Sequence, residues 1–563
     1  MVEPVQHAQA PAQPSPQVSP TGNPNPAEAA RELLDVGSRW GTDDYDARVR
    51  AFAEAIQQGD ADYQQALVAE ILAQDSDAFN SWMTPTRINA QVEAGQVSST
   101  ERGAMAEAIA GAYNDGQIPG HEIRDINGEV IGNASALDTY LHNPNSTSTD
   151  SVDNQVEHAR NMREFAEFFG GPLYSAEISE FRENFSSHLI EDYALNDKID
   201  DGMLRDNAAT QAAIVLNGDP TRGDIAASVL SGLDQGQLQA FMERVARGGE
   251  FLSAAHLEGI VPNSTVALRD GLEVSDVSLP DQFSSLVAQV ARTDSPEARE
   301  AAGMLARLPA SSGDVFDDGR TQNADDRADA MGQLFLAHSD SILDSFTDFD
   351  TTQIGSKDDA TLKQYMKDAS ELGSLFNVVL FNDDQAYQGS VRNAVLEYAT
   401  DLKSQINTTE GNAEAMGRLS MLMGAADDAI TQGFNDLKAK EDAQKELVSF
   451  IVDMALAGVP VGDKAKDSVA GLLGQVFSNP QVTEALKGVS GNIIDSATGY
   501  LTTEAKQALT DALGEDEAEL LDQQGASNAL REAMMAGVED QRDLAAIENY
   551  AEDVSQGINI WRK

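Results

Sequence analysis

The chain has 563 residues, a formal net charge of −55 at pH 7 and no cysteine. The charge argues against nucleic acid as a partner, because phosphates would be repelled, and the missing thiols exclude disulfides and cysteine-ligated zinc. A hydrophobic fraction of 41% is enough to build buried cores, so a globally disordered chain is not expected. The acidity fits either a protein partner with a basic surface or a solvated coat that maintains solubility.

The first 26 residues predict a disordered leader. Seven prolines stand among Gln, Ser and Asn in this stretch, a composition typical of extended chain. No basic start is followed by an apolar run, so we expect no cleaved Sec-type signal peptide. Export would then need a specialised bacterial secretion system, and without one the protein would stay in the cytoplasm.

Helical signals begin directly after the leader and predict an N-terminal helical domain over residues 27–145. Asn25 is placed to cap a helix whose first residue is Pro26. Ser98 and Glu101 have the spacing of a capping box, and Gly116 is placed to end the helix that follows.

One β-hairpin is expected within this domain, at residues 120–133. The dipeptide Asn127-Gly128 is the strongest short hairpin signal in the chain, because both residues accept the positive φ of a tight turn. A polar loop at 143–154 then predicts a domain boundary.

From about residue 155 onward nearly every stretch has helical periodicity. We expect a middle helical domain at 155–310, a C-terminal helical domain at 325–500 and an acidic helical tail at 501–563. Residues 266–283 are the exception and predict a short strand or an irregular crossing. The predicted fold class is therefore all-α, with several helical bundles or an array and one small hairpin.

A candidate calcium loop spans residues 314–325. Asp314, Asp318 and Asp325 stand at the first, fifth and twelfth positions, where calcium loops place oxygen ligands. Phe316 fills the third position without a side-chain oxygen, so a plain acidic loop is the alternative. We expect no other metal and no organic cofactor.

No catalytic motif is found. None of the seven histidines has the spacing of a zinc peptidase, and no nucleophile elbow is present. A pair of carboxylates for hydrolysis could stand among the 93 acidic residues, where a cleft and one raised pKa would mark it. The pattern favours a protein without enzymatic activity.

Two apolar arms at residues 447–477 flank a charged tip, which predicts either a membrane hairpin or a buried helix pair. Each arm is shorter than the ~20 residues that span a bilayer, and Asp453 interrupts the first arm, so the buried pair is favoured. The residues that would enter a membrane are Val448, Ile451, Val452, Leu456 and Val459.

Several phrases resemble the helical, non-catalytic regions of large bacterial secreted toxins and effectors of the polymorphic-toxin kind. They include LDVGSRWGTDDYDARVRAFAEAI, ADAMGQLFLAHSDSILDSF and the apolar stretch DMALAGVPVGDKAKDSVAGLLG. The resemblance covers residues 30–510 and implies an all-α, secreted effector. Such proteins carry a separate C-terminal toxin module, whereas the stretch after 510 is too short for one.

The expected function is therefore that of a secreted bacterial effector that binds a partner or perturbs a membrane. A basic chaperone, an immunity protein or a secretion component is the expected partner. A hydrolase of cell-wall or surface polymers is one alternative. A structural or scaffold part of an injection system is the other.

Overall fold

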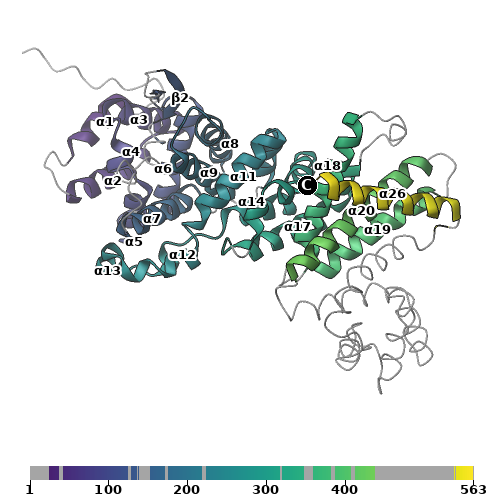
Figure 1. The fold of residues 1–563 in the computed structure, drawn as a ribbon. Helices are drawn as coiled ribbons and strands as arrows, with labels where there is room; N and C mark the ends of the chain where they lie inside the picture. The colour runs from purple at the N-terminus through teal and green to yellow at the C-terminus, as the bar shows by residue number, and fades with distance from the viewer. Residues whose placement is uncertain are drawn as a thin grey trace, which may run out of the picture. The chain divides into compact units, whose positions relative to one another are not determined.

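The computed structural model describes residues 25–36, 42–118, 120–124, 129–135, 137, 152–170, 175–218, 223–317, 320–347, 359–381, 387–406, 412–437, 538 and 541–561. Over these residues the protein is all-α with one two-stranded sheet, which confirms the predicted fold class (Figure 1). The chain forms two compact units. Unit 1 contains Met1–Val229 and Ala240–Phe283, and unit 2 contains Leu230–Gln239 and Ser284–Lys563.

The first half of the chain consists mainly of short helices. In order they are α1 (Pro26–Asp35), α2 (Thr42–Ile56), α3 (Ala61–Gln74), α4 (Ala78–Ser81), α5 (Pro85–Glu93), α6 (Ser99–Asn114), α7 (Val152–Phe169), α8 (Ala176–His188), the π-helical turn η3 (Leu189–Ala194), α9 (Gly202–Asn217), α10 (Gly223–Ser231) and α11 (Gln235–Glu250). Shorter elements follow: α12 (Ala254–Glu258), η4 (Val261–Asn263), α13 (Thr265–Asp270) and η5 (Val274–Asp276).

The N-terminal helices begin where the sequence predicts. Asn25 accepts a hydrogen bond of 3.1 Å from the second helical residue of α1, and Pro26 is the first helical residue. Ser98 and Glu101 exchange the two bonds of a capping box, at 3.1 and 2.7 Å, and so satisfy donors that α6 would leave open. Gly116 follows α6 with φ of +66°, a conformation that favours glycine.

The predicted hairpin is present. Strands β1 (Gly120–Arg124) and β2 (Val130–Ser135) pair antiparallel, with the first residue of β1 opposite the last residue of β2. The turn residues Asn127 and Gly128 lie outside the described part of the chain. In contrast, a strand at 266–283 is a wrong alternative, because α13 and η5 occupy that stretch.

Aromatic rings fill the centre of unit 1. Phe169, Phe181 and Phe185 are buried and stacked in series, with ring centroids 4.6 and 5.1 Å apart. Phe165 and Tyr113 add tilted and edge contacts from α7 and α6. Such pairs contribute roughly 0.5–1.5 kcal/mol each beyond the burial of their area, so this cluster holds α6, α7 and α8 together.

Longer helices dominate the second half of the chain. They are α14 (Gln282–Arg292), α15 (Pro296–Leu305), α16 (Leu308–Ser311), η6 (Gly313–Phe316), α17 (Ala324–Thr347), α18 (Asp359–Phe381), α19 (Gln388–Ile406), α20 (Asn412–Leu437) and α26 (Gln541–Trp561). Within unit 2, α17 packs on α15, α18 and α19, and α20 packs on α18, α19 and α26. The sequence predicts a finer division, into domains at 27–145, 155–310, 325–500 and 501–563. The two compact units do not test these bounds, which stay a prediction.

Candidate functional site

The membrane candidate lies outside the described residues. The structure does not describe the stretch 447–477, which contains Val448, Ile451, Val452, Leu456 and Val459. Among the helices that it does describe, none has the length and apolar character to cross a bilayer. The favoured buried helix pair and the alternative membrane hairpin therefore both stay predictions.

The candidate calcium loop is described in part. Asp314 lies in η6 and Asp325 in the first turn of α17, whereas Asp318 lies outside the described residues. Arg320 binds Asp314 at 2.5 Å and Asp317 at 3.3 Å, so a guanidinium already neutralises this acidic turn. No three His, Asp or Glu side chains of the described chain are grouped to hold a metal. Calcium binding stays a prediction that requires displacement of Arg320.

A carboxyl group with a raised pKa, the expected mark of a hydrolase, occurs at Glu164 of α7. Burial raises the pKa of Glu164, and the neighbouring Glu167 adds to the effect. The buried Asn89 of α5 donates its side-chain N–H to the Glu164 carboxyl at 2.5 Å. This carboxyl therefore joins α5 to α7, and a hydrolytic role for it has no further support.

Residues 252–279 form an excursion whose two ends meet. The Leu279 N–H donates to the Leu252 carbonyl at 2.9 Å, and α12, η4, α13 and η5 lie between these ends. The inner side of the excursion shares one apolar cluster with α7 and α9. Its buried members are Leu252, Leu257, Val261, Ala267 and Val277 from the excursion, Val156, Ala159 and Met162 from α7, and Ile214 from α9. Segment 252–279 is therefore packed onto α7 rather than extended from it.

Asp153, in the first turn of α7, holds the start of α13. Its carboxylate accepts hydrogen bonds from the Ser264 hydroxyl at 2.8 Å and from the Thr265 N–H at 2.7 Å and hydroxyl at 2.5 Å. These bonds lower the pKa of Asp153 to about 2. The bond from the Thr265 side chain has the largest effect, and the bond from the Ser264 side chain has the next largest. The carboxylate is thus charged at neutral pH and satisfies donors that a helix start leaves open.

Two arginines of α7 hold the rest of the segment. Arg160 binds Asp270 at the end of α13, with 3.3 Å between nitrogen and oxygen. Arg163 donates to the carbonyls of Ser275 and Ser278, the second at 3.2 Å. Because both arginines are about a third exposed or less, these contacts are only partly screened by water. They position the segment along one turn of α7.

A histidine completes the contact between α7 and α12. The ring of His256 lies 3.4 Å from the Gln155 side-chain oxygen, and burial lowers its pKa. His158, one turn further along α7, has its pKa lowered by burial to about 4. Both imidazoles are therefore neutral at pH 7 in the folded chain.

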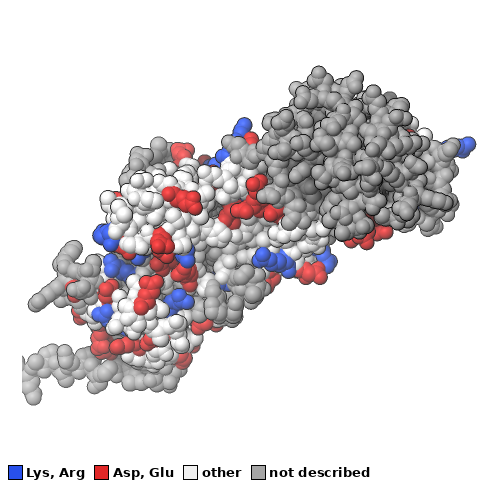
Figure 2. Space-filling view, turned by 90° about the horizontal axis from the view of Figure 1, so that it is seen from below, with Lys and Arg blue, Asp and Glu red and all other residues white. Residues whose placement is uncertain are grey.

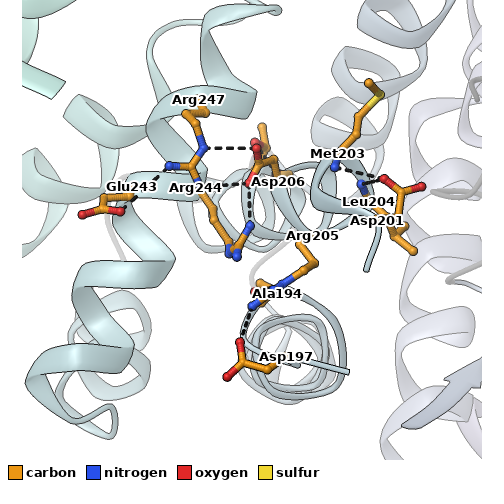
Figure 3. A network of polar contacts seen from close by, with 11 residues as sticks. Ala194, Asp197, Asp201, Met203, Leu204, Arg205, Asp206, Glu243, Arg244 and Arg247 are labelled. Atoms are coloured by element: carbon orange, nitrogen blue, oxygen red, sulfur yellow. Dashed lines mark hydrogen bonds and ion pairs between the residues drawn. The ribbon is translucent and has the colours of Figure 1, made fainter. Parts of the chain in front are cut away.

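The chain that leads into segment 252–279 is held where α11 packs against α9 (Figure 3). Asp206 of α9 lies between two arginines of α11, 2.9 Å from Arg244 and 3.2 Å from Arg247. The helices approach closely at Gly248, where an added Cβ would stand 2.1 Å from the Thr210 hydroxyl and 2.8 Å from the Asp206 carbonyl. Only glycine fits this contact, which fixes the end of α11 ahead of the segment.

The outer side of the segment exposes one large apolar side chain, and a second lies directly before the segment. Leu268 on α13 is 71% exposed and Phe251, directly before the segment, is 54% exposed, the two highest values among the described large hydrophobic residues. The segment also carries four carboxylates and one guanidinium. The face in Figure 2 shows acidic side chains among uncharged surface and scattered Lys and Arg side chains. Exposed apolar groups among like charges are a surface that another protein can cover.

Replacing Asp153 with alanine should loosen segment 252–279. The start of α13 would lose the hydrogen bonds from Ser264 and Thr265, and its open donors would then depend on water. Hydrogen exchange at the amides of α13 should become several-fold faster, while exchange in α3 stays unchanged. Asp197→Ala is the control, since this carboxylate is 95% exposed and bonds only within its own neighbourhood to Arg205. Equal exchange in both variants would contradict the proposed role of Asp153.

Comparison with known proteins assigns no family. No family model matches the chain, and no curated protein matches it. A crystal structure of importin beta matches 94% of this chain with 11% identity and a TM-score of 0.16, and the chain spans 57% of that importin chain. A homology model of the AP-3 complex matches 95% of this chain and 93% of its own, with 11% identity and a TM-score of 0.18. At these TM-scores neither likeness carries a functional argument.

The sequence predictions did not identify segment 252–279. A local signal was available, since Ser264 directly precedes a helical turn and Gly271 follows it with φ of +70°. The contact with Asp153 left no signal, because 111 positions separate it from Ser264 in the chain. A carboxylate among many others does not show which distant helix it caps.

Proposed function

We propose that the protein acts without catalysis, by binding another protein through the outer side of segment 252–279. The observation that carries this proposal is Leu268, a large apolar side chain that is 71% exposed on a segment fastened at several points. A surface that is already ordered loses little conformational entropy on binding, so apolar contacts made there contribute more fully to affinity.

The partner that fits combines apolar side chains with basic ones. The segment's carboxylates outnumber its single guanidinium, Arg269, and the whole chain carries a net charge of −55. Opposite charge increases the association rate, and apolar contact supplies most of the affinity. A basic chaperone, immunity protein or secretion component has this chemistry, and the role of a secreted effector belongs to the same proposal.

The test uses a synthetic amphipathic peptide of leucine and lysine, with binding followed by fluorescence anisotropy on the full chain. Leu268→Asp should weaken binding about tenfold or more, because a central apolar anchor becomes a charge. Raising the salt concentration should weaken binding in both the parent chain and the variant, since the basic peptide is also attracted by charge.

Met203→Asp is the matched control. Met203 is 43% exposed on α9 of the same unit, so this change adds the same charge to another apolar spot. If Leu268→Asp weakens binding no more than Met203→Asp does, the peptide is held by the net charge of the chain, and segment 252–279 is not the contact surface. A glutamate-leucine peptide of the same pattern should not bind.

A further inference from the structure

Phe251 is an exposed aromatic residue at the point where α11 ends and segment 252–279 begins. It is 54% exposed. Its one ring contact among the described residues is with His256 of α12, with 5.4 Å between the ring centroids and 89° between the ring planes. Such an edge-to-face contact covers at most one face of the phenyl ring. The rest of the ring is open to another molecule.

The backbone on both sides of Phe251 is held in place. The N–H of Leu252 donates to the Gly249 carbonyl at 3.1 Å, and the Leu252 side chain is buried in the apolar cluster under the segment. The Ser253 hydroxyl accepts from the His256 N–H at 3.3 Å and so caps α12. Binding at Phe251 would therefore order little additional chain and lose little conformational entropy.

A carboxylate lies near the same imidazole. Burial lowers the pKa of His256, and the charge of Glu250 raises it in the opposite direction. The Glu250 carboxylate therefore acts on the ring that Phe251 contacts, and Glu250 directly precedes Phe251 in the chain. A phenyl ring, an imidazole and a carboxylate are thus brought together at the end of α11.

The basic side chains of the protein itself do not cover this phenyl ring. Arg247, one turn before Phe251, binds Asp206 of α9 at 3.2 Å. In the described part of the chain no guanidinium lies over Phe251, whereas that of Arg307 lies 4.4 Å from the centre of the Phe346 ring. A guanidinium on an aromatic face is thus a contact that this protein makes elsewhere, and Phe251 has an exposed ring for it.

From these contacts we infer that Phe251 and Glu250 form a binding site for an arginine side chain of the partner protein. The guanidinium stacks on the open face of the phenyl ring and donates to the carboxylate, while His256 supports the ring from its other side. Arginine fits better than lysine, because its planar group can stack and bond at once, whereas an ammonium group is compact and strongly hydrated. The inference rests on the binding function proposed above and adds which basic residue the partner presents.

The test compares two amphipathic peptides of the same length and pattern, one of leucine and lysine and one of leucine and arginine, by fluorescence anisotropy on the full chain. The arginine peptide should bind the parent chain more tightly. Phe251→Leu should reduce this preference roughly two- to fivefold, the size of an exposed cation–π contact. Phe251→Trp should keep the preference, because tryptophan offers the most attractive ring face.

Tyr550→Leu is the matched control. Tyr550 is 48% exposed on α26, a helix that also carries exposed acidic residues, so this change removes another exposed ring from an acidic surface. It should leave the arginine preference as in the parent chain. An arginine preference that Phe251→Leu leaves unchanged, or that Tyr550→Leu lowers by as much, overturns the arginine site.

His256 acts as a positioning residue for the phenyl ring. His256→Ala should lower the preference for the arginine peptide, and His256→Phe should restore it, because a phenyl ring can make the same edge contact. A role of His256 in folding alone would change the binding of both peptides in parallel, and that result would contradict its positioning role.

Leu268→Asp separates this inference from the proposed function. If Leu268→Asp weakens the binding of both peptides while Phe251→Leu leaves the arginine preference unchanged, the binding surface stands and the arginine site is wrong. If Leu268→Asp has no effect while Phe251→Leu lowers the preference, the arginine site stands and the outer side of segment 252–279 is not the contact surface.

Discussion

Replacing Arg307 with methionine is expected to lower the free energy of unfolding of unit 2 by about 3 kcal/mol, because two nearly buried carboxylates lose their cation. Arg307 binds Asp368 at 2.6 Å and also binds Glu371, and these side chains are 17%, 10% and 13% exposed. It donates to the Ser345 carbonyl at 2.8 Å, and its guanidinium lies 4.4 Å from the centre of the Phe346 ring. One side chain thus joins the start of α16 to α17 and α18.

The loss should stay at the lower end of the range for broken buried pairs. Gln364 still donates to Asp368 at 2.9 Å, and Lys367 still lies 3.5 Å from Glu371. Arg307→Lys should recover only part of the stability, because an ammonium group cannot bridge two carboxylates, a carbonyl and a ring at once.

The measurement is hydrogen exchange of α17 and α18 in increasing urea, which follows unit 2 separately from unit 1. Arg299→Met is the control, because its ion pair with Asp294 is 53% and 85% exposed and should contribute less than about 0.5 kcal/mol. A triple variant with Arg307→Met, Asp368→Asn and Glu371→Gln should be more stable than Arg307→Met alone. Similar losses for Arg307→Met and Arg299→Met would show that the bridge contributes no more than a surface pair.

Features encoded within a few residues were predictable from the sequence. The cap at Asn25, the capping box of Ser98 and Glu101, and the hairpin around Asn127 each depend on neighbours less than one turn away. The long helices α18, α19 and α20 follow from apolar periodicity alone. For these elements the local preference and the final fold agree.

The fastening of segment 252–279 and the bridge at Arg307 were not predictable, because both depend on residues far apart in the chain. Asp153 and Ser264 are 111 positions apart, and Arg307 and Asp368 are 61 apart. With 93 acidic residues, the sequence offers every basic group many equivalent partners, and only the packed helices select one. Gly424 of α20 gives no signal in the sequence either, because its close approach to Val554 of α26 depends on a helix that is remote in the chain.

The strand alternative at 266–283 shows how packing decides an ambiguous stretch. Alternating apolar residues there agree with a strand as well as with short helical turns. The Asp153 cap and the apolar cluster under Ala267 and Val277 stabilise α13 and η5 instead. Neither contact can be read from the stretch itself.

Unit 1 should lose at most about 2 kcal/mol of stability between pH 7.5 and 5.0 through His158, whose side chain is partly buried. Burial lowers the pKa of His158 to about 4, from an ordinary value of 6.5. Below pH 6.5 the imidazole of His158 therefore binds a proton in the unfolded chain, whereas in the folded chain it does so only near pH 4. The free energy of unfolding falls across this window as the pH is lowered. His256 has its pKa lowered in the same direction and should add to the loss.

The decisive comparison is His158→Gln, followed by urea-dependent hydrogen exchange of α7 at the two pH values. Acid also reduces the repulsion within a chain of net charge −55, which stabilises both proteins alike, so the difference between them isolates the histidine. Asp153 cannot produce this difference, because its pKa of about 2 places its loss below pH 3.8. The raised pKa of Glu164 has the opposite sign, since its contribution is present in acid and is lost as the pH rises. A parent chain and a His158→Gln variant that change in parallel from pH 7.5 to 5.0 would show that this imidazole takes up protons equally well folded and unfolded.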